Sequence, residues 1–121
     1  MKLSEIAALA EAARISGKTD KEIAGGYTSD LLSDVMAHAK TGEVLVTIQA
    51  HKNTLAVASL VGAPAIILCN NRPIPEDMVE AAEQEDISLF RTSLTQFEVS
   101  GRLWAALRAS RGAGQGPGRP A

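Results

Sequence analysis

The sequence contains a single cysteine, Cys69, and very few aromatic side chains. One cysteine excludes a disulfide within the chain and a zinc site built from several cysteines. Because Cys69 lies in an apolar run, we expect a small buried residue rather than a reactive thiol. Aromatic residues make up 3% of the chain and apolar residues 45%. The core must therefore consist mainly of Ala, Val, Leu and Ile.

Long apolar runs and a strong excess of one charge are also missing. No segment approaches the roughly 18 apolar residues of a membrane span. Residues 1–14 carry charged side chains and lack the uncharged run of a signal peptide. The formal net charge of −2 does not provide the basic surface of a general nucleic-acid-binding protein. We therefore expect a cytoplasmic protein with no metal, no cofactor, and neither nucleic acid nor membrane as a partner.

Apolar periodicity predicts three consecutive strand–helix units after residue 43. The strands are expected at 44–49, 64–69 and 87–90. A helix capped by Asn53 runs to about Val61, a second begins at Pro75, and a last one ends near Ala109. Ser93 and Gln96 have the spacing of a capping box for the last helix. Successive strand–helix units predict a layered α/β fold with a mostly parallel sheet and helices packed on it.

The first half of the chain is less regular. A short helix is expected over 2–10, whereas residues 11–16 either continue it or form a short strand. A further helix is expected over 29–40, with Thr28 or Ser29 as its N-cap. We predict one domain over residues 1–109. The Gly/Pro-rich residues 110–121 cannot bury much area and are expected to form a disordered tail.

The stretch GGYTSD, residues 25–30, invites comparison with a phosphate-binding loop. Such a loop needs glycines whose amides approach an anion at the start of a helix. The Gly-Lys-Ser/Thr ending of a nucleotide triphosphate loop is missing. Asp30 and Asp34 would also repel a phosphate from the first two helical turns. We therefore predict a glycine turn that leads into a capped helix.

Polar residues gather where the three predicted strands end. In open α/β sheets, ligands bind outside the carboxyl ends of the strands. Amide, guanidinium, imidazole and hydroxyl groups there suit a small anion or a nucleotide phosphate, although polar loops and helix caps are also common without any ligand. The candidate ligand-binding residues are Gln49, His51, Asn53, Asn70, Arg72 and Thr92.

No catalytic motif is visible. Asp34 and His38 are four residues apart on one helix face and predict an exposed ion pair, because two ligands alone do not make a zinc site. There is no HExxH and no Gly-x-Ser-x-Gly sequence. An enzyme would have to depend on Cys69 or His51, and neither has a visible partner group.

The segment DKEIAGGYTSDLLSDVMAHAKTGEVLVTIQAHKNTLAVASL, residues 20–60, resembles the DRTGG domain family, and the likeness continues to about Leu103. Asp20, Gly25 and Gly26 match the letters of the family name, whereas Lys21 replaces the arginine and Ala24 the threonine. The resemblance implies the layered α/β fold of the HPr kinase N-terminal domain. The family includes inserts beside CBS domains in nucleotide-regulated pyrophosphatases, where they help to form a dimer interface, and small stand-alone proteins. Kinase activity is not implied here, because the phosphate loop is missing.

Two functions follow as hypotheses. The first is a non-catalytic regulatory or interaction module, a homodimer formed through Phe97 and Trp104 on the last helix, with a further protein partner encoded elsewhere. The second is a sensor that binds a nucleotide or phosphorylated metabolite at the strand ends. An enzyme is the third and least supported reading.

Overall fold

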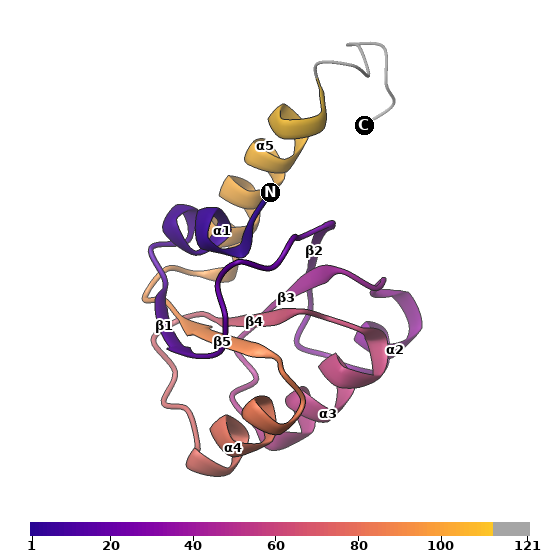
Figure 1. The fold of residues 1–121 in the computed structure, drawn as a ribbon, viewed down its shortest axis with the longest axis vertical. Coiled ribbons are helices and arrows are strands. Elements are labelled where there is room, and N and C mark those ends of the chain that lie inside the picture. Colours follow the sequence, from indigo (N-terminus) through magenta and orange to yellow (C-terminus); the bar gives the residue numbers. More distant parts are fainter. Residues whose placement is uncertain (113–121) are drawn as a thin grey trace.

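The structure is a computed structural model that describes residues 1–112, and these form one sheet between two layers of helices (Figure 1). The helices are α1 (Leu3–Leu9), α2 (Leu32–His38), α3 (Lys52–Val61), α4 (Glu76–Gln84) and α5 (Gln96–Gly112). The strands are β1 (Ala13–Ser16), β2 (Gly25–Thr28), β3 (Glu43–Thr47), β4 (Ala65–Leu68) and β5 (Ser88–Arg91). The predicted α/β layered class is confirmed.

The five strands follow the order β1-β5-β4-β3-β2 across the sheet. Strands β2 to β5 run parallel to one another, and β1 joins the far edge antiparallel to β5. The three predicted strands form the centre, which explains why they read as continuous apolar runs: both faces of a parallel sheet are covered. The alternative left open for residues 11–16 resolves as strand β1.

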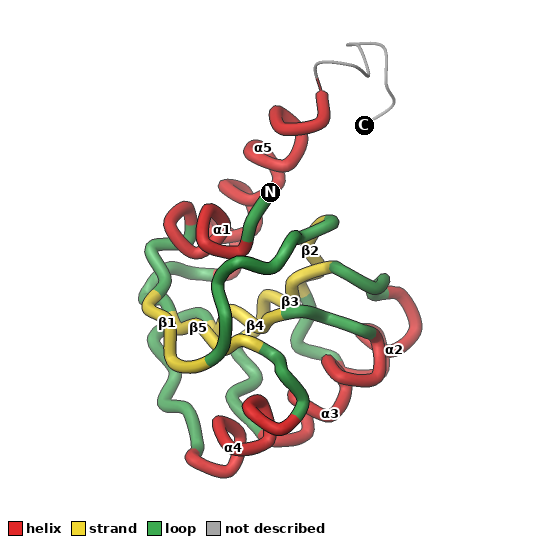
Figure 2. Tube along the Cα trace, viewed as in Figure 1, coloured by secondary structure: helices red, strands yellow, loops and turns green. Residues whose placement is uncertain are grey.

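Each pair of consecutive parallel strands is joined by one helix, and all three of these helices lie on the same face. Figure 1 shows α2, α3 and α4 on one side of the strands and α1 with α5 on the other, and Figure 2 marks the strand layer between them. Alternate side chains of β3 therefore enter different cores. Val44 and Val46 pack under α1 and α5, whereas Leu45 packs under α2 and α3.

Strand β2 corrects the prediction of a glycine turn. Gly25 to Thr28 pair in register with β3, from Glu43 to Val46, and form an edge strand. Neither Gly25 nor Gly26 has a positive φ, so the backbone here does not require glycine. The prediction failed because four residues with two glycines carry almost no strand propensity of their own; pairing with β3 decides the conformation.

Several helix starts also differ from the predictions. Helix α2 begins at Leu32 with Leu31 as its N-cap, because the Ser29 hydroxyl accepts instead from the Leu31 amide in a tight turn (3.2 Å). Helix α3 is capped by His51, not by Asn53. A short polar side chain near a helix start can satisfy several different backbone groups, so sequence spacing alone leaves the cap position open.

The capping box of α5 lies two residues further along than predicted. The Thr95 hydroxyl accepts from the Glu98 amide (3.2 Å), and the Glu98 carboxylate accepts from the Thr95 amide (3.1 Å). Helix α5 continues to Gly112, three residues beyond the expected domain boundary. The rest of the predicted tail, residues 113–121, lies outside the described residues. In the described part of the chain, no helix combines the length and apolar character that a membrane span requires.

Candidate functional site

The carboxyl ends of β3, β4 and β5 meet at one edge of the sheet, as the sequence predicts. Five of the six candidate side chains are exposed there, in the loops that follow β3 and β4 and in the first turn of α3. These exposed residues are Gln49, His51, Asn53, Asn70 and Arg72. None of them lines the two cavities beside α5 or the cavity between α3 and α4 in the described part of the chain.

The directions in which the chain leaves the strands determine where a crevice forms at this edge. A crevice forms in open α/β sheets where the strand order reverses, because the two neighbouring connections then leave on opposite faces. Here β2, β3, β4 and β5 follow one another in a single direction. The helices that connect them all lie on one face, whereas β5 leads into α5 on the opposite face (Figure 1). The connections of two neighbouring parallel strands therefore diverge after β4 and β5, and there the Asn70 and Asn71 amides donate to the carbonyls of Leu94 and Thr92.

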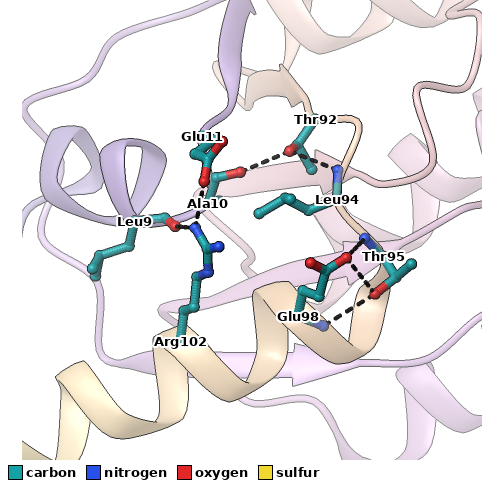
Figure 3. A network of polar contacts seen from close by, with 8 residues as sticks. All are labelled: Leu9, Ala10, Glu11, Thr92, Leu94, Thr95, Glu98 and Arg102. Carbon is teal, nitrogen blue, oxygen red and sulfur yellow. Dashed lines mark hydrogen bonds and ion pairs between the residues drawn. The ribbon is translucent and has the colours of Figure 1, made fainter.

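His51 and Thr92 have structural roles at this edge. The His51 Nδ1 atom accepts from the Asn53 amide (3.0 Å) and caps α3, which leaves Nε2 for other contacts. Thr92 is buried, and its hydroxyl donates to the Ala10 carbonyl (2.7 Å) and accepts from the Leu94 amide (3.1 Å). Figure 3 shows the Thr92 side chain between these two groups. Thr92 thus holds the start of the β5–α5 connection instead of facing a ligand.

Asn70 and Asn71 form a left-handed turn after β4. Their φ values are 60° and 52°, a conformation that asparagine tolerates better than most residues. Their amides donate to the carbonyls of Leu94 (3.0 Å) and Thr92 (2.8 Å). The backbone of this turn is therefore fixed against the loop that begins α5, while the Asn70 side chain stays exposed.

Asp30 is the polar residue at this edge whose role the sequence did not reveal. It was expected on the first turn of a helix, but it precedes α2 and points toward the end of β3. Its Oδ1 atom accepts from the Thr47 hydroxyl (2.8 Å), the Ile48 amide (3.0 Å) and the Gln96 side-chain amide (2.8 Å). One carboxylate thereby joins β3 to the start of α5. Only the fold brings these four residues together, so no sequence spacing signals it.

The Asp34–His38 pair forms as predicted. The His38 Nδ1 atom lies 3.1 Å from Asp34 Oδ1 on the exposed face of α2. The Tyr27 hydroxyl also donates to Asp34 Oδ2 (2.8 Å). This hydrogen bond is the main reason that the pKa of Asp34 is lowered, and it raises the pKa of Tyr27. The hydrogen bond between Tyr27 and Asp34 ties α2 to β2. Among the described residues, no group of three His, Cys, Asp or Glu side chains could hold a metal ion.

Cys69 is fully buried between the sheet and the α1–α5 layer, as predicted. Burial, and secondarily the negative charge of Asp30, raise the pKa of its thiol to about 11. A thiol with a pKa this high is protonated at neutral pH and is neither a nucleophile nor a metal ligand. Cys69 is therefore a neutral side chain of the core at neutral pH.

Two neighbouring cavities lie between α5 and the open edge of the sheet. An apolar cavity of about 380 Å³ separates α5 from β2. A second cavity of about 370 Å³ continues it toward the start of β3, past Lys40 and Glu43. We call the first cavity the α5 groove. Its lining residues are Gly26, Thr28, Val46, Phe97, Ser100, Gly101, Leu103, Trp104 and Leu107.

Helix α5 is held at its start and along the side that faces α1. Arg102 Nη1 donates to the Leu9 carbonyl (3.1 Å) and to Glu11 Oε2 (2.7 Å), as Figure 3 shows. On the opposite side, the Thr28 and Ser100 hydroxyls share a hydrogen bond of 2.6 Å. These contacts set the position of α5 above β2 and β3, with the groove open toward solvent.

Two large aromatic side chains remain in water beside this groove. Phe97 is 88% exposed and Trp104 is 57% exposed. The Arg108 guanidinium lies 5.5 Å from the centre of the Trp104 ring. Large exposed apolar side chains beside an apolar hollow mark an interaction surface more often than isolated ones do. The sequence predicted both side chains as candidates for an interface, and the structure adds the groove beside them.

The sheet order, the helical layers and the polar strand ends define a layered α/β domain of the type found in DRTGG and HPr kinase N-terminal domains. A model of the family described as HPr serine kinase N terminus matches residues 44–107, which is more than half of the chain. The chain belongs to this family.

Two known proteins resemble this chain, one in sequence and one in fold. The HPr kinase/phosphorylase of Streptococcus uberis is 45% identical over 40 residues, which are 33% of this chain and 13% of that protein. A crystal structure of the CBS and DRTGG domains of the Clostridium perfringens pyrophosphatase regulatory region, in complex with the activator diadenosine tetraphosphate, superposes with a TM-score of 0.68. The alignment covers 84% of this chain and 45% of that one, at 12% identity. The chain thus spans less than half the length of both relatives, and the second likeness concerns the fold alone.

Proposed function

We propose that this chain is a non-catalytic regulatory and interaction module that works as a homodimer, with a further protein partner encoded elsewhere. The observation that carries the proposal is the unpartnered apolar face of α5, where Phe97 and Trp104 flank the α5 groove. We also propose that residues 1–109 are one folding unit and that the chain works in the cytoplasm.

The area available on this face supports an interface of ordinary size. Phe and Trp side chains each bury roughly 150–250 Å² when covered. Given the exposed fractions of Phe97 and Trp104, these side chains from two copies would together remove roughly 600 Å² from water. That is about half of the roughly 1,200 Å² in the smallest stable specific interfaces. The walls of the groove and the neighbouring strand edge are close enough to supply the rest.

A matched pair of variants tests this surface. Phe97→Ala removes a side chain that makes almost no contact inside the monomer, so we expect the monomer to remain folded and self-association to weaken. Leu60→Ala removes a comparably exposed side chain (72%) from α3, on the other face of the sheet. Sedimentation velocity should show weaker association for Phe97→Ala and no change for Leu60→Ala. If Phe97→Ala and Leu60→Ala associate equally well, the α5 face is not the dimer interface.

The alternative is a small-ligand sensor at the carboxyl ends of the strands. Gln49, His51, Asn53, Asn70 and Arg72 are exposed on one edge and offer amide, imidazole and guanidinium donors. Such groups suit the phosphate of a nucleotide or of a phosphorylated metabolite. We leave Thr92 out of this proposed set, because its hydroxyl is buried and already paired on both sides. The ligand reported for the C. perfringens region makes diadenosine tetraphosphate a natural probe.

Thermal shift measurements test the sensor. A ligand at about one hundred times its Kd stabilises a protein by roughly 2.7 kcal/mol, which corresponds to roughly 8–12 °C in Tm for a domain of this size. We expect the shift to be lost in Arg72→Gln and kept in Lys18→Gln, since Lys18 is exposed at the opposite end of the sheet. A panel of nucleotides and sugar phosphates without any shift would rule the sensor out.

A non-catalytic role is favoured by what the candidate groups already do. The Cys69 thiol is buried, and burial raises its pKa to about 11. One ring nitrogen of His51 is used to cap α3. Catalysis by a nucleophile needs an adjacent base within hydrogen-bonding distance. Within residues 1–112, neither side chain has such a partner in its hydrogen bonds or ion pairs.

A further inference from the structure

The edge strand β2 is unguarded. It pairs with β3 on one side, and within the described residues no backbone hydrogen bond reaches Gly25 to Thr28 from the other. Natural edge strands are usually protected by proline, lysine, a bulge or a covering segment. The sequence Gly-Gly-Tyr-Thr contains neither proline nor lysine. Gly26 and Thr28 are exposed, Tyr27 is half-buried and Gly25 is buried, so the end of β2 near Thr28 is the more open part of this edge.

The α5 groove runs along this same edge in a fixed direction. Phe97 and Ser100 lie near Thr28, at the carboxyl end of β2, whereas Trp104 and Leu107 lie beside Gly26, near its amino end. Helix α5 therefore runs antiparallel to β2. Along this edge, α5 presents Phe97 first, then the small residues Ser100 and Gly101, and then Trp104.

We infer that two copies pair through the β2 edge and the α5 face together, around a twofold axis perpendicular to the sheet. This inference rests on the proposed homodimer and specifies its geometry. Such an axis makes the two β2 strands antiparallel and joins the sheets into one of ten strands. It also sets the two α5 helices antiparallel on the same side, so that Phe97 of each copy meets Trp104 of the other.

The spacing of the elements allows both contacts at once. Neighbouring strands lie roughly 4.8 Å apart. Helix α5 contacts β2 and β3, so its axis lies above the gap between them, roughly 5 Å from the proposed twofold axis. The two helix axes would then be about 10 Å apart, at the upper end of the 8–10 Å range of packed helices.

The side chains at the proposed crossing are compatible with close approach. Ser100 and Gly101 lie midway between Phe97 and Trp104 along α5, and a Cβ added at Gly101 would meet no atom within 4 Å in the monomer. Small residues let two helix backbones approach each other, while the aromatic side chains on either side interlock. One surface thus carries both halves of a self-complementary contact, which a twofold interface requires. A second copy of this chain is the occupant that fits.

Mixing two charge variants tests this pairing. Phe97→Glu and Trp104→Arg should each weaken self-association at least ~30-fold, the cost typical of a buried aromatic anchor. In an equimolar mixture, Glu at 97 faces Arg at 104 of the other copy and the second Phe97–Trp104 contact is intact. We therefore expect the mixed dimer to associate within about tenfold of the wild-type dimer. Leu60→Glu, on the far face, serves as the control and should associate normally.

The outcomes separate the two proposals. If the wild-type chain stays monomeric, the proposed homodimer itself is wrong. If the wild type dimerises but the mixture associates no better than either variant alone, the antiparallel pairing of α5 is wrong. Hydrogen exchange tests the strand contact: the outer-edge amides of β2 should be protected in the dimer and exchange rapidly in Phe97→Glu. Rapid exchange in a wild-type dimer would overturn the ten-stranded sheet. Circular dichroism confirms that each variant is folded.

Discussion

Asp30 should be one of the most sensitive polar positions in the domain, and Asp30→Ala tests this. Its Oδ1 atom accepts three hydrogen bonds, from the Thr47 hydroxyl, the Ile48 amide and the Gln96 side chain. Thr47 is fully buried, so its hydroxyl loses an acceptor that water cannot easily replace. A hydrogen bond to a charged group contributes roughly 1.5–3 kcal/mol, and a buried donor left unpaired costs roughly 1–3 kcal/mol.

Because the three bonds share one atom, their contributions will not add fully. We expect Asp30→Ala to lower the free energy of unfolding by roughly 3–5 kcal/mol, out of the 5–15 kcal/mol typical of a domain. Asp30→Asn keeps an acceptor oxygen in place and should cost about half as much. Urea unfolding followed by far-UV circular dichroism gives both values, with the exposed Glu80→Ala as control. A loss below about 1 kcal/mol for Asp30→Ala would refute the assigned role of this carboxylate.

Four further predictions concern the buried Cys69 and two glycines in opposite surroundings. Cys69 should react with thiol reagents at pH 8 only after unfolding, and rapid reaction of the folded chain would contradict its burial. Burial raises the pKa of Cys69 from 9.0 to about 11 in the folded chain. The free energy of unfolding that depends on the neutral thiol should therefore be complete below pH 9 and decrease by up to ~3 kcal/mol as the pH rises through 11. In urea titrations, Cys69→Ala should lack this part of the alkaline loss. Gly17→Ala should destabilise by roughly 2–4 kcal/mol, since Gly17 has a φ of 90° and a Cβ there would lie 2.5 Å from Ser88 Oγ. Gly101→Ala, in open space on α5, should instead be neutral or stabilising at concentrations where the chain is monomeric, and equal losses at both glycines would contradict the account.

The part of the fold that the sequence predicted is the part with strong hydrophobic periodicity. The central strands around Leu45, Ile66 and Leu89 are covered on both faces, so their sequences are continuous apolar runs that mark a buried parallel sheet. The helices between them follow from the same alternation. The edges carry no such signal. Strand β2 contains two glycines, and β1 is exposed over its first half, so in both cases pairing with a neighbouring strand decides the structure.

For the candidate sites too, some features follow from the sequence and others depend on tertiary contacts. Parallel strands bring their carboxyl ends to one edge, and His51, Asn70 and Arg72 follow two of these strand ends. Their role as ligand-binding residues stays a prediction. The packing of the loops at that edge depends on contacts such as those of the Asn70 and Asn71 amides with the carbonyls of Leu94 and Thr92, which the sequence does not reveal. Phe97 and Trp104 were recognisable as interface candidates, because apolar residues lie on both edges of the predicted last helix. The groove beside them depends on how far α5 covers β2, and that is set by tertiary contacts.

The central claim is that this chain is a homodimeric module that associates through the α5 face. Sedimentation equilibrium of the wild-type chain, from low micromolar concentration upward, tests it most directly. The account predicts a reversible, concentration-dependent rise from the monomer mass to twice that mass, with no larger species. A constant monomer mass over the whole range would contradict it.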